Sequence, residues 1–183
     1  GIMQHVTAED ASMIAGVKLN TGGWFFPQAG FVSPKALCEA YIKAYPKQIT
    51  LRFEQEAIAL EYDTQWKVKD KNGNVIATAP VVIIANANDA KQFECCSAFP
   101  LRCVRGQTTH YPASAQSKKL QTILCYEGYM IPAIDGMHMV GATFQPDDRD
   151  VHLRVADHEE NTSMLKPYIP NNFLDATDSN TLQ

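Results

Sequence analysis

The tripeptide at residues 105–107, Arg-Gly-Gln, has residue types that could act on a ligand. Arg105 carries a permanent positive charge that could stabilise negative charge on a bound cofactor. A glycine inside a predicted strand, such as Gly106, often marks a close approach of the backbone to a ligand. A strand bulge with a solvated arginine would explain the same residues. We therefore treat Arg105 and Gly106 as candidate cofactor-binding residues and keep the structural explanation as the alternative.

The segment at residues 125–129, Cys-Tyr-Glu-Gly-Tyr, is a second candidate. Tyr126 and Tyr129 each combine an aromatic face with a hydroxyl group, so together they could line a substrate pocket. Ordinary packing of a strand accounts for the same composition. The sequence is compatible with both a substrate pocket and ordinary strand packing.

A third candidate, Asn86-Ala87, follows the apolar run Val-Val-Ile-Ile-Ala at residues 81–85. An apolar run without alternation predicts a strand covered on both faces, typically a central parallel strand. In open α/β sheets, ligands bind beyond the carboxyl ends of such strands. Small residues there allow a ligand to come close, although this signal is weak by itself.

The aromatic stretch at residues 22–34, Gly-Gly-Trp-Phe-Phe-Pro-Gln-Ala-Gly-Phe-Val-Ser-Pro, predicts a strand, a tight loop and a helix start. Its glycines allow unusual backbone angles or close contact with a ligand, and its aromatic rings must be buried or must cover something flat. Ser33-Pro34 fits the beginning of a helix. The stretch is either a well-packed corner or a loop over a planar cofactor, with Gln28 in that loop.

Two N-terminal helices are predicted from capping signals and apolar spacing. Thr7 and Asp10 have the spacing of a capping box, and Gly16 is a typical stop for the short helix between them. A second helix begins at Pro34 and ends before Pro46, with one apolar face formed by residues spaced three and four apart.

Strands are predicted at residues 49–53, 57–62, 65–69 and 75–78, with a turn at Asn72-Gly73. Asn-Gly accepts the positive φ angles of a tight hairpin turn. These segments therefore predict a small antiparallel meander with one solvated face.

The second half of the chain is predicted to begin with a strand at residues 101–110, interrupted by glycine. Strands at residues 123–132 and 137–144 follow, joined by a turn that contains Asp-Gly. A last helix opens at residues 157–160, and residues 173–183 are expected to fray.

Composition excludes several classes of protein for this segment. A net charge of −4 argues against a segment devoted to nucleic-acid binding; Lys118 and Lys119 with Arg102 form either a local basic patch or a solvated loop. The five histidines and five cysteines have no metal-ligand spacing, so no metal is expected. There is also no glycine-rich phosphate-binding motif.

Cysteine usage and hydropathy predict a cytoplasmic protein without a membrane anchor. The five cysteines form an odd set, and the adjacent Cys95 and Cys96 are poorly placed for a disulfide with each other. Free thiols in a reducing compartment are the simplest account. No apolar run reaches the length of a membrane span, and no signal peptide is visible.

Five stretches in one order resemble a known family. Residues 22–34, 81–86, 101–107, 124–129 and 140–144 together are similar to the flavin-dependent oxidoreductase half of MnmC, a family of bifunctional tRNA-modifying enzymes in the D-amino-acid-oxidase-like superfamily. Each stretch is a weak signal, but five in this order are specific. The resemblance covers most of the chain, from about residue 9 to residue 144 and beyond.

The resemblance implies a mixed α/β (α+β) fold. It implies an antiparallel-rich sheet of a substrate domain together with part of an FAD-binding domain that includes the small β-meander. Residues 49–93 would belong to the FAD-binding part, and residues 17–45 and 99–170 mostly to the substrate-binding part. The segments that hold the FAD adenine and pyrophosphate would lie outside residues 1–183, so the isolated chain is expected to be an inactive internal fragment.

The resemblance also implies a function for the longer protein. That protein would oxidise a C–N bond of 5-carboxymethylaminomethyl-2-thiouridine at the tRNA wobble position with FAD, leaving the aminomethyl form. A methyltransferase domain would then methylate the amine with S-adenosylmethionine. Alternatives are another FAD-dependent amine or amino-acid oxidase of the superfamily, or a non-catalytic binding module for a protein or RNA.

The residues carried over by the resemblance are six cofactor contacts and two substrate contacts. The substrate contacts are Tyr126 and Tyr129, whereas the flavin would lie near Gln28, Gly30, Asn86, Ala87, Arg105 and Gly106. The family usually has glycine where this chain has Ala29 and Ala87, and the methyl group of Ala87 puts its flavin contact in doubt.

Overall fold

The computed structural model describes residues 1–174. The chain divides into two compact units, which we call the sheet unit (Gly1–Ser33 with Val104–Gln183) and the meander unit (Pro34–Cys103). Helices and strands are mixed in the chain, and every strand pair within residues 1–174 is antiparallel, which confirms the predicted fold class. The assignment of residues 49–93 to an FAD-binding part stays a prediction.

The N-terminal part of the sheet unit is a strand–helix–strand element. Strands β1 (Gln4–Val6) and β2 (Gly23–Phe25) pair with each other, and helix α1 (Ala8–Ala15) lies between them in sequence.

The predicted capping box of α1 is confirmed. The backbone N–H of Asp10 donates to the Thr7 hydroxyl at 3.2 Å, and the Thr7 N–H donates to the Asp10 carboxylate at 3.3 Å. Gly16 ends the helix in the left-handed region, at φ +72°, which glycine adopts without steric cost.

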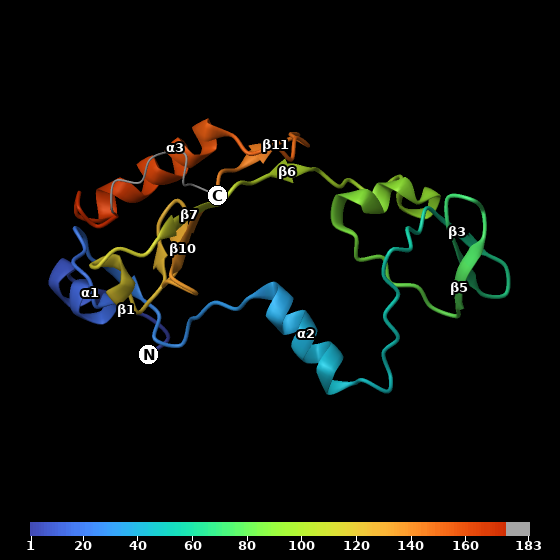
Figure 1. The fold of residues 1–183 in the computed structure, drawn as a ribbon, viewed down its shortest axis with the longest axis horizontal. Helices are drawn as coiled ribbons and strands as arrows, with labels where there is room; N and C mark the ends of the chain where they lie inside the picture. Colours follow the sequence, from blue (N-terminus) through green and yellow to red (C-terminus); the bar gives the residue numbers. More distant parts are fainter. Residues whose placement is uncertain (175–183) are drawn as a thin grey trace. The chain divides into compact units, whose positions relative to one another are not determined.

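The main sheet of this unit has the strand order β7-β10-β9-β8, and Figure 1 labels its strands β7 and β10. The bounds are β7 Thr109–Pro112, β8 Leu124–Cys125, β9 Tyr129–Met130 and β10 Met137–Gly141. The strand predicted at residues 123–132 is broken, because Gly128 makes a tight turn in which its carbonyl accepts from the Tyr126 N–H at 2.9 Å.

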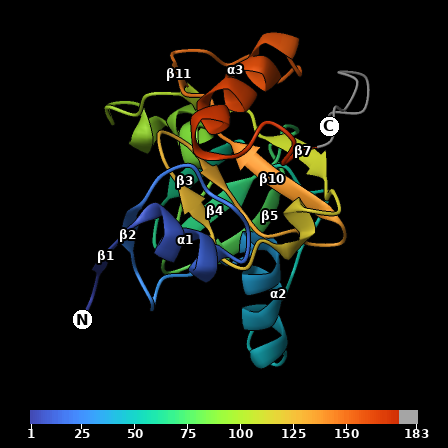
Figure 2. The ribbon, with the colours of Figure 1, turned by 90° about the vertical axis from the view of Figure 1, so that its left-hand side faces the viewer.

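Helix α3 (Val155–Leu165) packs against β7 and β10 (Figure 2). The short helix η4 (Lys166–Tyr168) continues it, and η3 (Ser117–Lys119) follows β7 in the chain. A separate two-stranded ribbon joins β6 (Val104–Arg105) to β11 (Gln145–Pro146). The predicted interruption of residues 101–110 is therefore confirmed.

The core of the sheet unit lies between α1, the main sheet and the C-terminal segment. Its buried side chains are Ala15, Val17, Tyr111, Leu120, Met130, Val140, Leu165, Ile169 and Phe173. Phe173 is only 1 % exposed, so the prediction that the chain frays from residue 173 is wrong at that residue. The rest of that prediction, residues 175–183, lies outside the described residues.

The meander unit confirms three of the four predicted strands as an antiparallel sheet. Strands β3 (Ala59–Tyr62), β4 (Trp66–Lys69) and β5 (Val75–Ala79) pair in sequence order. Gly73 in the connecting turn has φ +81°. Residues 49–53 form no strand, so that prediction is wrong.

The remaining helices of the meander unit are α2 (Pro34–Ala44), η1 (Ala87–Gln92) and η2 (Glu94–Cys96). Helix α2 begins at the predicted proline, but none of its residues is buried. A small core forms from Ala90, Phe93 and Cys96.

The predicted central strand at residues 81–85 is also wrong. These residues form no strand, and Ile83 is 86 % exposed. A strand covered on both faces needs hydrogen-bonded neighbours on its two sides, and no strand within residues 1–174 supplies one. The run at residues 81–85 is apolar, but residues 1–174 contain no strand that pairs with it.

Candidate functional site

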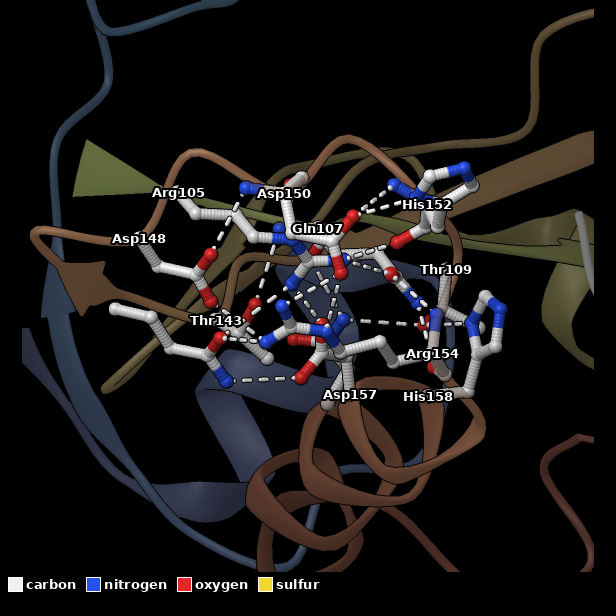
Figure 3. Close-up of polar contacts among 12 residues, drawn as sticks. Arg105, Gln107, Thr109, Thr143, Asp148, Asp150, His152, Arg154, Asp157 and His158 are labelled. Atoms are coloured by element: carbon white, nitrogen blue, oxygen red, sulfur yellow. Dashed lines mark hydrogen bonds and ion pairs between the residues drawn. The ribbon is translucent and has the colours of Figure 1, made fainter. Parts of the chain in front are cut away.

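The Arg105 side chain lies at the centre of a buried polar network (Figure 3). Its Nη2 donates to Gln107 Oε1 at 2.8 Å and to the His152 carbonyl at 2.7 Å, and its Nε donates to the Asp150 carbonyl at 2.7 Å. Its Nη1 forms an ion pair with the Asp157 carboxylate. The Arg105 and Asp157 side chains are only 7 % and 2 % exposed, so the charge of Arg105 is neutralised inside the protein.

Gln107 links this network to the start of α3. Its Oε1 accepts from the Arg154 N–H at 2.9 Å, and its Nε2 donates to the Arg154 carbonyl at 2.9 Å. Its own N–H donates to the Thr143 hydroxyl at 3.0 Å. Arg154 is the residue that precedes the first turn of α3, so Gln107 fixes the helix end against the segment that connects β6 to β7.

A second arginine, Arg154, forms the more exposed edge of the network. It donates to Asp148 at 2.6 Å, to Asp150 at 2.7 Å and to Gln145 at 2.9 Å. The hydrogen bond from Arg154 lowers the pKa of Asp148. The pKa of Asp150 is also lowered, first by the backbone N–H of His152 and then by Arg154. Both carboxylates therefore stay ionised and hold the loop before α3.

The inner face of α3 continues the network with a short chain of hydrogen bonds. Asn161 Nδ2 donates to the Thr109 hydroxyl at 3.1 Å, and that oxygen lies 2.9 Å from His158 Nδ1. The Thr109 hydroxyl has one proton to donate and two lone pairs to accept with, so both tautomers of His158 satisfy this contact. Within residues 1–174, Asn161 Oδ1 is a buried oxygen without a partner.

The structure brings Tyr126 and Tyr129 together in the β8–β9 hairpin. The Tyr126 hydroxyl donates to the Tyr129 carbonyl at 3.3 Å, and its ring stacks on Tyr168 with 5.0 Å between ring centroids. Burial raises the pKa of Tyr126, so its hydroxyl remains a neutral donor. The Tyr168 hydroxyl donates to Glu127 at 2.8 Å, which lowers the pKa of that carboxyl.

Gly106 lies near the same end of the main sheet as Tyr129. A Cβ at Gly106 would be 3.0 Å from the Thr143 carbonyl oxygen, and the Thr143 N–H donates to the Gln107 carbonyl at 3.2 Å. Strand β10 pairs with β7 on one side, while its Gly141 lies opposite Tyr129 on the other. The close approach at Gly106 is therefore to the protein's own backbone.

Gln28 and Gly30 lie in an exposed loop after β2. The Ala29 N–H donates to the Phe26 carbonyl at 3.0 Å, which closes the turn that contains Gln28. A Cβ built on Gly30 would meet no atom within 4 Å. The neighbouring Trp24 is 59 % exposed. This loop is not a packed corner, and the space beside Gly30 is open.

Asn86 and Ala87 begin helix η1 in the meander unit, and both are exposed. Ala87 has φ +50°, a left-handed conformation in which a side chain costs about 1–2 kcal/mol relative to the ordinary helical region. Glycine has no such cost. The backbone at residue 87 therefore favours glycine over the alanine that is present.

Replacing Ala87 with glycine should consequently stabilise the meander unit by up to about 1 kcal/mol, because relief of the left-handed strain exceeds the extra entropy of glycine in the unfolded chain. The matched control is Ala85→Gly, at an exposed alanine without positive φ, which should destabilise by roughly 0.5–1 kcal/mol. Urea unfolding of both variants measures the difference. Equal destabilisation by both would contradict the inferred strain.

The eight predicted site residues differ in exposure. Gln28 and Gly30 lie in an open loop, whereas Arg105 is buried. The Arg105 guanidinium donates to oxygens inside the protein and is buried. The alternative interpretation, a solvated arginine, is therefore wrong. Contact of any of the eight residues with a flavin stays a prediction, and no group of three or more metal-ligating side chains occurs within the described residues.

Two partners in the site escaped the sequence reasoning. Asp157 lies 52 residues from Arg105, and no local pattern pairs an acidic residue in the first turn of a helix with an arginine so distant. The contact of Tyr168 with Tyr126 is also not predictable from local sequence, because it forms only when the chain after α3 returns to the β8–β9 hairpin. For Asp157, the sequence signal is the excess of charged residues at 148–157, which indicates a cluster of ion pairs.

The family described as FAD dependent oxidoreductase (DAO) matches residues 2–181. The chain belongs to this family. Among its relatives are proteins named tRNA 5-methylaminomethyl-2-thiouridine biosynthesis bifunctional protein MnmC. The one from Paraburkholderia phytofirmans is 39% identical over 166 residues, and the one from Chromobacterium violaceum is 39% identical over 172 residues. The alignments cover 90% and 92% of this chain but only 25% and 26% of those relatives.

Solved structures confirm the fold. Glycine oxidase from Geobacillus kaustophilus has a TM-score of 0.76 at 19% identity, over 92% of this chain and 47% of that one. Glycine oxidase from Bacillus cereus has a TM-score of 0.75 at 17% identity, again over 92% of this chain and over 48% of that one. At these identities the likeness concerns the fold alone. No helix within residues 1–174 is long and apolar enough to span a membrane.

Proposed function

We propose that this chain is part of a flavin-dependent, tRNA-modifying oxidoreductase. Its substrate is 5-carboxymethylaminomethyl-2-thiouridine at the wobble position, and its product is the aminomethyl form. The observation that carries the proposal is 39% identity with MnmC proteins across 90% of the chain. Since the chain spans about a quarter of those relatives, this activity, the methylation by S-adenosylmethionine and the cytoplasmic location are proposed for the longer protein.

In this proposal the chain supplies surfaces rather than the reactive group. FAD, when bound, accepts the hydride removed from the substrate C–N bond. Gln28 and Gly30 form an open surface for the ring, and Tyr126 and Tyr129 line the substrate side at the β8–β9 hairpin. Gly106 contributes backbone at the end of the sheet, while Arg105 holds that backbone in place through its internal bonds. In the meander unit, Asn86 and Ala87 are the remaining proposed flavin contacts.

The test is made on the longer natural protein that contains this chain. We expect it to purify with flavin absorbance and to convert tRNA that carries the carboxymethylaminomethyl group, with no turnover of glycine, sarcosine or D-amino acids. Turnover of free amino acids alone would replace the proposal with a different amine oxidase. Absence of flavin, together with salt-sensitive tRNA binding by this chain, would indicate a binding module.

A pair of glycine variants tests the flavin surface itself. Gly30→Val places a branched side chain on the open loop, so the flavin content of the longer protein should fall. Gly23→Val is the matched control, because a Cβ at Gly23 also meets no atom within 4 Å but lies on strand β2. Equal flavin content in the two variants, at equal yield of folded protein, would remove Gly30 from the proposed site.

A further inference from the structure

The adjacent residues Cys95 and Cys96 hold their sulfur atoms close together on the short helix η2. The two Sγ atoms are 3.8 Å apart. Cys95 is exposed, whereas Cys96 is only 5 % exposed and packs with Ala90 and Phe93 in the core of the meander unit. One thiol is therefore accessible to a reagent, and the second lies directly behind it.

The separation of the sulfur atoms favours a shared third atom over a direct bond. A disulfide requires about 2.05 Å between the sulfur atoms, so the two thiols would have to close by a large fraction of their separation. Two sulfur atoms that each bind one shared atom at about 2.3 Å stand at most about 4.6 Å apart. The observed separation of 3.8 Å lies within this limit, so both sulfur atoms reach one shared atom.

The number of protein ligands near Cys95 and Cys96 narrows the kind of atom that the two sulfur atoms can bind. Structural zinc sites use four protein ligands and catalytic zinc sites use three, but within residues 1–174 no group of three or more histidine, cysteine or acidic side chains could hold a metal ion. A monosubstituted trivalent arsenical needs only two sulfur atoms, because its third bond is already made to carbon. We propose that Cys95 and Cys96 form a vicinal dithiol site that binds such an arsenical through both sulfur atoms.

The binding step is a condensation without oxidation or reduction. Two arsenic–sulfur bonds form, the arsenic–oxygen bond breaks, and the oxygen leaves as water with the two thiol protons. The exposed Cys95 reacts first. Burial raises the pKa of Cys96, so this thiol keeps its proton longer and reacts second, within the same molecule.

Phenylarsine oxide is the probe, added in equimolar amount to the full chain. Intact mass should show one phenylarsenic group gained and two hydrogens lost. The triple variant Cys38→Ser/Cys103→Ser/Cys125→Ser should bind equally, because it keeps the adjacent pair. Cys95→Ser should weaken binding by about 100-fold or more, the usual gain from a second attachment in the same molecule. A dithiol should release the probe, whereas a monothiol should not.

Several results would overturn the site. These are unchanged uptake by Cys95→Ser, loss of uptake in the triple variant, or release by a monothiol at the same rate as by a dithiol. Cys95→Ser decides the question even if variants at the buried Cys96 do not fold, because Cys95 is exposed. A circular dichroism spectrum equal to that of the unchanged chain verifies that this variant is folded.

Discussion

Replacing Asp157 with alanine is expected to lower the free energy of unfolding of the sheet unit by about 3–5 kcal/mol. The reason is that Arg105 would keep its charge in a buried position after losing the carboxylate that neutralises it. The remaining partners of Arg105 are carbonyl and amide oxygens, at 2.7–3.5 Å. These oxygens orient the guanidinium, but they carry no negative charge.

Helix α3 provides a matched control for this variant. Glu160→Ala removes a carboxylate three residues further along the same helix, from an exposed position, and should change stability by no more than about 0.5 kcal/mol. The double variant Arg105→Met/Asp157→Leu should be more stable than Asp157→Ala, because it leaves no unpaired charge in the interior.

Urea unfolding can be followed separately for the sheet unit. The chain has two tryptophans, Trp24 in the sheet unit and Trp66 in the meander unit. A Trp66→Phe background leaves Trp24 as the reporter for the network. A loss below about 1 kcal/mol for Asp157→Ala would mean that the buried ion pair contributes little to this fold.

Local signals in the sequence predicted local structure well. The capping box at Thr7 and the left-handed stop at Gly16 were found where expected, because each depends on residues within one helical turn. The Asn72-Gly73 turn and its meander were likewise predictable from neighbouring residues. Such elements need no information about distant parts of the chain.

Predictions that depended on distant partners were less successful. The apolar run at residues 81–85 predicts a buried strand only if other strands flank it, and none pairs with it within residues 1–174. Phe173 looked like part of a polar tail, yet it fills the core of the sheet unit because the chain returns there after α3. Arg105 was identified as chemically important, but its partner Asp157 was not, since that pairing exists only after folding.

The other large effect is expected at Gly22, the first residue of the aromatic stretch. A Cβ built on Gly22 would overlap the Val6 carbonyl oxygen and would lie 2.8 Å from the Thr7 carbonyl carbon and 3.0 Å from the Ala8 nitrogen. These are backbone atoms at the end of β1 and the start of α1, so they cannot turn aside as a flexible side chain would. Gly22→Ala should therefore cost about 3 kcal/mol, the upper end of the usual range for overpacking.

The adjacent Gly23 makes this prediction specific, because a Cβ there would meet no atom within 4 Å. Gly22→Ala should lower the melting temperature by roughly 6–12 °C for a chain of this size, whereas Gly23→Ala should leave it nearly unchanged. Equal melting temperatures for the two variants would show that β2 can move away from α1 without cost. The expected difference instead assigns Gly22 to the contact between β2 and the start of α1, which leaves the later part of the loop, around Gly30, as the surface open to a ligand.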